Sequence, residues 1–120
     1  LVKNKIPFVN ENEIMKNALK ILNDKKLGFL VVINNQGLNA GVFTDGDLKR
    51  IMQKKRKIDN LKIKLFMTKK PYTVEENTLA TEVLSLMNKK KITNVCVYKK
   101  NNKKKTIGIL HIHNLLSLLK

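Results

Sequence analysis

The sequence predicts an α+β fold that is built from two copies of one strand–helix–strand–strand–helix unit. The chain has 120 residues, of which 42% are hydrophobic and 28% are charged, a composition typical of folded globular proteins. When the chain is compared with itself, PFVNENEIMKNALKIL (residues 7–22) aligns with YTVEENTLATEVLSLM (72–87). Further on, GVFTDGDL (41–48) aligns with GILHIHNL (108–115), after a turn that is two residues longer in the second copy.

In the first copy, an extended segment over residues 7–9 leads into a helix that Asn10 or Asn12 is expected to cap. The helix has a one-sided apolar stripe made of Ile14, Ala18, Leu19, Ile21 and Leu22. A buried strand is expected next at residues 29–33, followed by a turn at 34–37. A second strand then opens with Gly41, and the last helix begins at about residues 45–47.

The second copy repeats this pattern. Its extended segment covers residues 72–74, and Asn77 or Thr78 is expected to cap its first helix. The apolar stripe of that helix consists of Leu79, Val83, Leu84, Leu86 and Met87. The two strands are expected at residues 95–98 and from Gly108, with a long turn at 99–105 between them and a last helix near 113–114.

The repeat suggests how the chain divides. We expect the first repeat at residues 1–57, a basic linker at 58–65 and the second repeat at 66–120. Each copy is too small to bury a comfortable core alone, so we expect the two to pack together through their sheets. The single cysteine, Cys96, lies in an apolar run and is predicted to be a small core residue.

Two motifs carry a resemblance to a known family. The run GVFTDGDL, with its second copy GILHIHNL, and the run MTKKPYTV (67–74) are similar to the signatures of a tandem pair of CBS domains, also called a Bateman module. TDGDLKR and HIHNLL further resemble the C-terminal part of bacterial arabinose-5-phosphate isomerases, in which a sugar-isomerase (SIS) domain precedes a CBS pair. A chain that begins with Leu1 fits a piece of such a longer protein.

The resemblance implies a function. It implies that this chain is the non-catalytic regulatory part of an isomerase that interconverts ribulose 5-phosphate and arabinose 5-phosphate for Kdo, lipopolysaccharide or capsule biosynthesis. It implies no required cofactor, and a regulatory ligand such as CMP-Kdo, AMP or ATP in the cleft between the repeats. The implied assembly is a homodimer through CBS pairs, within a homotetrameric parent. The alternative is a structural oligomerisation module that has no small-molecule ligand.

Thr44 and Asp47 are the leading candidates for ligand binding. They lie three residues apart where a strand runs into a helix, so both side chains can face one cavity. A carboxylate accepts hydrogen bonds from the vicinal hydroxyls of a sugar, and a hydroxyl beside helix N–H groups donates to phosphate. The family resemblance implies the same roles for these two residues. Gly46 would let the backbone approach a ligand closely, whereas Asp45 is expected to serve the start of the helix.

Four further residues complete the candidate ligand site. His111 and Asn114 replace Thr44 and Asp47 in the second copy, which predicts a polar but less acidic cleft that is not equivalent to the first. Lys70 and Thr73 lie where the second copy begins. Lys70 is either a phosphate partner or one of many exposed lysines.

Other kinds of site find little support in the sequence. Asp45 with Asp47, and His111 with His113, are incomplete sets of metal ligands, so we predict no metal site. Helical serines such as Ser85 have no partner base that would make them nucleophiles, so we predict no catalytic activity in this chain.

The net charge of +16 has two interpretations: a solvated basic surface, or attraction of anionic ligands or nucleic acid. Lys, Asn and Ile make up 49 of the 120 residues, which indicates AT-rich codons and favours the first interpretation. Only 5% of the residues are aromatic, which argues against nucleic acid as a partner. The longest apolar run, residues 27–33, is too short to span a bilayer, so we expect no membrane partner and a cytoplasmic location.

Overall fold

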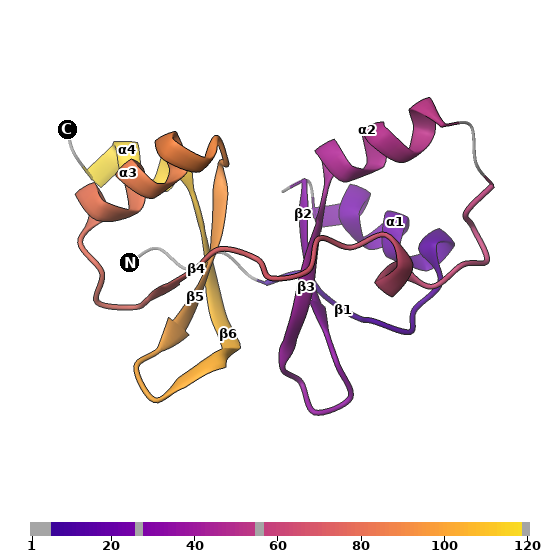
Figure 1. The fold of residues 1–120 in the computed structure, drawn as a ribbon, viewed down its shortest axis with the longest axis horizontal. Helices are drawn as coiled ribbons and strands as arrows, with labels where there is room; N and C mark the ends of the chain where they lie inside the picture. The colour runs from indigo at the N-terminus through magenta and orange to yellow at the C-terminus, as the bar shows by residue number, and fades with distance from the viewer. Residues whose placement is uncertain (1–5, 26–27, 55–56, 119–120) are drawn as a thin grey trace. The chain divides into compact units, whose positions relative to one another are not determined.

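The computed structural model describes residues 6–25, 28–54 and 57–118, and the chain divides into two compact units (Figure 1). The first unit covers Pro7–Pro71 and the second begins at Tyr72. Each unit contains the predicted strand–helix–strand–strand–helix order, with a three-stranded sheet and two helices. The predicted α+β class with two repeats is therefore confirmed.

The first unit contains three strands, two α-helices and one short 3₁₀ helix. These are β1 (Phe8–Asn10), α1 (Met15–Lys25), β2 (Phe29–Ile33), β3 (Asn39–Thr44), α2 (Asp45–Gln53) and η1 (Ile63–Leu65). Strand β2 lies at the centre of the sheet, parallel to β1 and antiparallel to β3. Because β3 runs directly into α2, the first residues of α2 lie at one end of the sheet.

The second unit repeats this arrangement with three strands and two helices. These are β4 (Thr73–Glu75), α3 (Ala80–Lys90), β5 (Asn94–Lys99), β6 (Asn102–His111) and α4 (Ile112–Leu118). The strand order is β4-β5-β6, with a parallel and then an antiparallel pair.

The pairing registers of the two sheets confirm the alignment of the copies. Phe29 pairs with Thr44 in the first unit, and Asn94 pairs with His111 in the second. The register thus places Thr44 and His111 at equivalent positions, each at the end of the third strand of its sheet.

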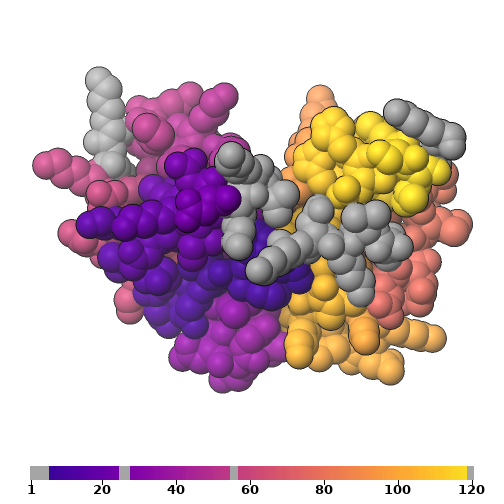
Figure 2. All heavy atoms as spheres, turned by 180° about the vertical axis from the view of Figure 1, so that it is seen from behind, coloured from indigo at the N-terminus to yellow at the C-terminus, as the bar shows by residue number. Residues whose placement is uncertain are grey.

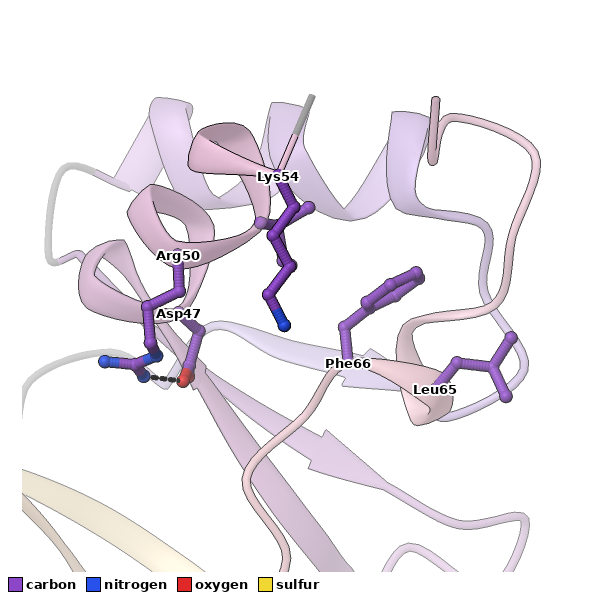
Figure 3. A pocket seen from close by; sticks show the side chains of 6 residues that line it. Asp47, Arg50, Lys54, Leu65 and Phe66 are labelled. Carbon is purple, nitrogen blue, oxygen red and sulfur yellow. Dashed lines mark hydrogen bonds and ion pairs between the residues drawn. The ribbon is translucent and has the colours of Figure 1, made fainter. Parts of the chain in front are cut away.

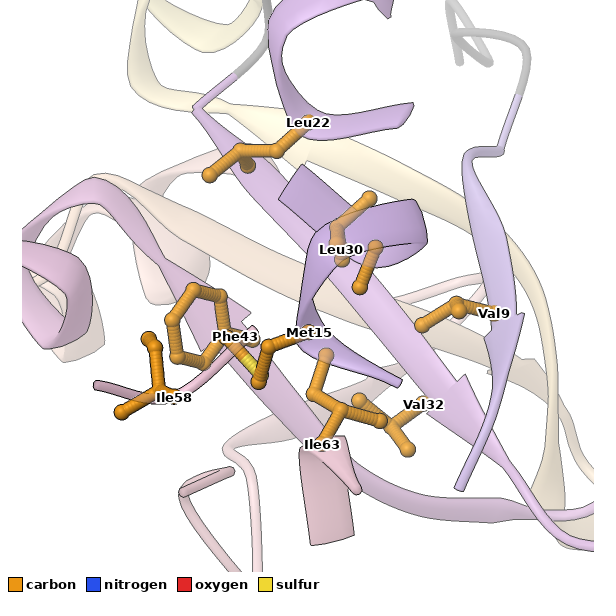
Figure 4. Packing of buried hydrophobic residues seen from close by; sticks show 9 residues of the cluster. Val9, Met15, Leu22, Leu30, Val32, Phe43, Ile58 and Ile63 are labelled. Atoms are coloured by element: carbon orange, nitrogen blue, oxygen red, sulfur yellow. The ribbon is translucent and has the colours of Figure 1, made fainter. Parts of the chain in front are cut away.

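The core of the first unit lies between its helices and its sheet (Figure 4). Met15, Leu30 and Phe43 have no exposed surface. Two further core residues, Ile58 and Ile63, come from the stretch that was predicted as a linker. Residues 58–65 therefore pack as part of the first unit, because their isoleucines complete its core. In the second unit Cys96 is buried, as predicted.

Two local predictions are wrong. Helix α3 begins at Ala80, so its N-cap is Leu79, which has no side-chain cap, and both Asn77 and Thr78 lie before that position. The turn predicted at residues 99–105 is much shorter, since Lys99 already pairs with Asn102. Residues 103–105 belong to β6, and residues 99–105 are all exposed (Figure 2). Lysines are compatible with this strand because its outer half faces solvent.

Candidate functional site

A capping box joins the end of β3 to the start of α2. Thr44 is the N-cap residue, and its hydroxyl oxygen accepts a hydrogen bond from the backbone N–H of Asp47 at 3.2 Å. In return, the Asp47 carboxylate accepts from the backbone N–H of Thr44 at 2.9 Å. The pair satisfies two N–H groups that a helix start would otherwise leave unpaired. The predicted proximity of Thr44 and Asp47 is thus present in the structure.

The expectation that Asp45, rather than Asp47, serves the helix start is wrong. Asp45 is the first residue of α2 and its side chain is exposed, whereas Asp47 occupies the third helical position and makes the capping box. Only a residue at that third position can return a side chain to the N-cap backbone. Asp45 is left with an interaction with the helix dipole, which is a smaller effect.

Two further donors converge on the carboxylate of Asp47. The hydroxyl of Thr68 lies 3.2 Å from Oδ1 and 3.4 Å from Oδ2, and the guanidinium of Arg50 forms an ion pair with Oδ1. Asp47 is only 7% exposed. Burial of a carboxylate is tolerated here because both of its oxygens have partners. A ligand that binds this carboxylate must therefore displace one of its donors.

Thr68 reaches Asp47 because the chain returns to the edge of β3. Its N–H donates to the carbonyl of Val42 at 2.7 Å, and its carbonyl accepts from the Val42 N–H at 3.0 Å. The close approach requires a glycine beside the bridge, since a Cβ on Gly41 would lie 2.5 Å from the Thr68 carbonyl oxygen. The glycine that opens the GVFTDGDL motif thus has a packing role.

The second unit keeps one of the two hydrogen bonds of the capping box at the equivalent position. The side-chain oxygen of Asn114 accepts from the backbone N–H of His111 at 3.1 Å, as Asp47 accepts from Thr44. The imidazole Nδ1 of His111 accepts from the backbone N–H of His113 at 3.1 Å. The amide therefore replaces the carboxylate at the helix start without its negative charge.

The two imidazoles of the second unit stack on each other. The ring centroids of His111 and His113 lie 4.7 Å apart, with 28° between the ring planes. Burial lowers the pKa of His111 below its ordinary value, and the nearby charge of His113 lowers it further. The lowered pKa of His111 favours its neutral ring. The hydrogen bond from the His113 N–H does so too, because Nδ1 can accept it only when it carries no proton.

This arrangement predicts a stability that depends on pH. The unfolded chain binds a proton at His111 near pH 6.5, whereas the folded chain does so only at a lower pH. Because the unfolded state then holds more protons, the contribution of His111 is fully present above pH 6.5 and is lost as the pH falls through the lower, folded pKa. The free energy of unfolding, measured by urea denaturation at several pH values between about 5 and 7.5, is expected to fall with acid in this window. His111→Asn should make the fall shallower, and an unchanged slope in that variant would contradict the assignment.

A pocket of about 270 Å³ lies beside Asp47 in the first unit (Figure 3). Three charged residues, Asp47, Arg50 and Lys54, line it from α2. Its apolar lining comes from Ile51 on the same helix and from Leu65 and Phe66 around η1. The pocket therefore combines a basic wall with an apolar wall.

The remaining predicted site residues occupy separate positions. Gly46 lies in the first turn of α2, and a Cβ there would meet the Thr44 hydroxyl oxygen only at 3.5 Å, an ordinary contact. Lys70 is exposed, with a left-handed backbone at φ 57°. Thr73 opens β4 and pairs with Cys96. The structure thus gathers Thr44, Gly46 and Asp47 in the first unit, and His111 and Asn114 in the second.

Several residues of this region are not predicted by the sequence. Arg50 has a detectable signal, because it follows Asp47 at the three-residue spacing of helical neighbours. Thr68 belongs to the MTKKPYTV motif, but nothing local indicates that it returns to Val42. The same holds for Phe66, whose position depends on the path of residues 58–66.

Within residues 6–25, 28–54 and 57–118, no three His, Cys, Asp or Glu side chains gather as ligands for a metal ion. None of the helices in this described part of the chain has the length and hydropathy needed to cross a bilayer.

Comparison with known proteins places these features in a family. Residues 1–54 and 62–120 each match the CBS domain family. The arabinose 5-phosphate isomerase KdsD of Escherichia coli (strain K12) is 34% identical over 111 residues, which cover 92% of this chain and 33% of that protein. The chain thus spans about a third of the length of the curated relatives it matches.

Solved structures agree with this match. A putative signal-transduction protein with CBS domains from Burkholderia ambifaria superposes with a TM-score of 0.84 at 25% identity, over 96% of this chain and 82% of that one. CBSX2, whose crystal structure is a complex with AMP, superposes with a TM-score of 0.77 at 24% identity, over 95% of this chain and 87% of that one. The chain therefore belongs to the CBS domain family, of which it carries two copies in tandem.

Proposed function

We propose that the chain is the regulatory, non-catalytic part of an arabinose 5-phosphate isomerase that acts in Kdo, lipopolysaccharide or capsule biosynthesis. The similarity to KdsD supports this parent, because it extends over 92% of the chain. The match covers 33% of KdsD, so the remainder of that protein is long enough to contain a separate catalytic sugar-isomerase domain. A cytoplasmic location and a homotetrameric parent form part of the same proposal.

The proposed ligand is a nucleotide or a nucleotide sugar such as CMP-Kdo, AMP or ATP, bound at the start of α2. The observation that carries this proposal is the buried carboxylate of Asp47, held by Thr44 and Thr68 at the start of α2. The bonds from Thr68 are long, at 3.2 and 3.4 Å, so this hydroxyl is the donor that a ligand hydroxyl displaces most easily. The complex of CBSX2 with AMP, a ribonucleotide, supports a ligand of this kind.

Other residues have subsidiary roles in the proposal. Gly46 lies beside Asp47 in the first turn of α2, where its N–H approaches the phosphate of the ligand. Lys70 supplies a cation and Thr73 a hydroxyl from the start of the second copy. His111 and Asn114 line the second, uncharged cleft, which binds a different part of the ligand or another ligand.

Calorimetric titration of the chain with CMP-Kdo, AMP, ATP and S-adenosylmethionine tests the proposal. Asp47→Asn is the informative variant, because Asn114 already shows that an amide can accept the N-cap N–H at this position. We expect this variant to fold and to bind the preferred ligand about tenfold more weakly, since a carboxylate forms stronger hydrogen bonds with hydroxyls than an amide does. Asp45→Asn, which changes an exposed neighbour, should bind normally. Absence of binding by all four ligands would refute the ligand-sensing role.

An oligomerisation module is the second candidate. Helix α4 leaves Leu116 and Leu118 46% and 54% exposed, while Leu115 is buried in the core. Met52 on α2 is 66% exposed. Apolar side chains at these positions are suited to an interface between two copies of the chain. Analytical ultracentrifugation decides between the states: a dimer supports this role, and a monomer at high micromolar concentration contradicts it.

A further inference from the structure

The pocket beside α2 has a chemical character of its own (Figure 3). It lies within the first unit, between one face of α2 and the segment around η1. Its volume of about 270 Å³ is larger than the roughly 150 Å³ cavity that holds a benzene molecule. A single ring with one attached acidic group is therefore of suitable size.

The basic wall of the pocket contains one paired and one unpaired cation. Arg50 is neutralised by its ion pair with Asp47. Lys54 lies one helical turn further on, and its ammonium group points into the hollow between α2 and Phe66 (Figure 3). Among the described residues no carboxylate forms an ion pair with Lys54. Its positive charge is therefore available to an anion from solution.

The opposite wall offers apolar surface to the same space. Leu65 is 64% exposed, and the ring of Phe66 is half-buried beside it. Ile51 adds apolar surface from α2 itself. An exposed leucine and an aromatic ring, opposite an unpaired ammonium group, suit a ligand with an apolar or aromatic part next to its acidic group.

The second repeat provides an internal control. The alignment of GVFTDGDL with GILHIHNL, continued along the last helix, places Ser117 at the position of Arg50 and Leu118 at the position of Ile51. The second copy thus keeps the apolar residue and lacks the first cation. The cation that pairs with Asp47 is consequently a property of the first repeat.

We propose that this pocket is a binding site for a small anionic ligand that carries an apolar or aromatic group, such as an aryl phosphate or carboxylate. Lys54 binds the acidic group of this ligand, and Leu65 and Phe66 contact its apolar part. All residues of the site belong to the first compact unit, Pro7–Pro71. The acidic group of the ligand is held by Lys54, which takes no part in the nucleotide site proposed at Asp47.

Phenyl phosphate is a suitable probe, because it combines one ring with one dianionic group. We expect saturable changes in the ¹H–¹⁵N NMR spectrum of the full chain, confined to the amides of residues 50–54 and 65–66. Lys54→Met keeps the aliphatic stem of the side chain and removes its charge, and it should weaken binding about tenfold. Lys49→Met removes a charge from an exposed position of the same helix outside the pocket, and it should leave the affinity unchanged.

Three outcomes would overturn the proposal: no saturable change, an equal effect of the two lysine variants, or binding of inorganic phosphate as tight as that of phenyl phosphate. Asp47→Asn separates this site from the proposed nucleotide cleft. It should weaken the binding of a nucleotide but strengthen that of phenyl phosphate, because Arg50 then loses the charge that neutralises it. Failure of one site is therefore distinguishable from failure of the other.

Discussion

Replacement of Asp47 by alanine is expected to lower the free energy of unfolding by about 2–4 kcal/mol, from the loss of a helix cap and of buried hydrogen-bond acceptors. The substitution removes the acceptor of four groups at once: the backbone N–H and the hydroxyl of Thr44, the hydroxyl of Thr68 and the guanidinium of Arg50. The Thr44 N–H would then lie at a helix start without an acceptor. Urea denaturation followed by circular dichroism measures the effect.

Asp45→Ala is the matched control for this prediction. Asp45 is exposed and lies two residues before Asp47 in the same turn of α2, but it takes no part in the capping box. Its loss should cost only the interaction with the helix dipole, about 0.3–1 kcal/mol. Equal effects of the two substitutions would mean that the network around Asp47 contributes little to stability.

Gly41→Ala is expected to destabilise the first unit by roughly 1–3 kcal/mol, the usual cost of overpacking. The new methyl group would lie 2.5 Å from the Thr68 carbonyl oxygen and 3.0 Å from the sulfur of Met67. The methionine side chain can move away, but the carbonyl is held by its hydrogen bond with Val42. We expect the bridge between Val42 and Thr68 to open, with faster hydrogen exchange at both amides.

Gly46→Ala serves as the comparison for Gly41→Ala. A Cβ at Gly46 meets only ordinary contacts, and alanine favours a helix over glycine by up to about 1 kcal/mol. This variant should be as stable as the parent chain or slightly more stable. If both alanine variants were equally stable, the close approach of residues 67–68 to β3 would have to be less tight than the structure shows.

The sequence allowed the repeat and the equivalence of residues in its two copies to be predicted well, because both depend on patterns that extend over tens of residues. The equivalence of Thr44 with His111, inferred from aligned letters, reappears in the sheet pairing of the two units. Periodicity also identified α1, whose stripe residues Ala18 and Leu22 are buried. Long, regular patterns are informative because burial of one face imposes them on the sequence.

The details of the candidate site were harder to predict. The acidic pair in TDGD allows two different caps, and only the backbone geometry shows that Asp47 makes the box. Thr68 and Phe66 reach α2 through chain reversals after residue 54, which no local pattern indicates. The position of such residues depends on tertiary packing and therefore appears only in the structure.

The return of the chain to β3 has a consequence for synthesis on the ribosome. The first repeat resembles a complete unit by residue 57, yet Ile58, Ile63 and the bridge of Thr68 with Val42 all come later in the chain. A nascent chain that has left the ribosome only as far as residue 57 therefore lacks part of the core of this unit and the partner of one sheet edge. Domains generally fold as units during synthesis. The first unit is thus completed only when the segment that leads into the second repeat has left the exit tunnel.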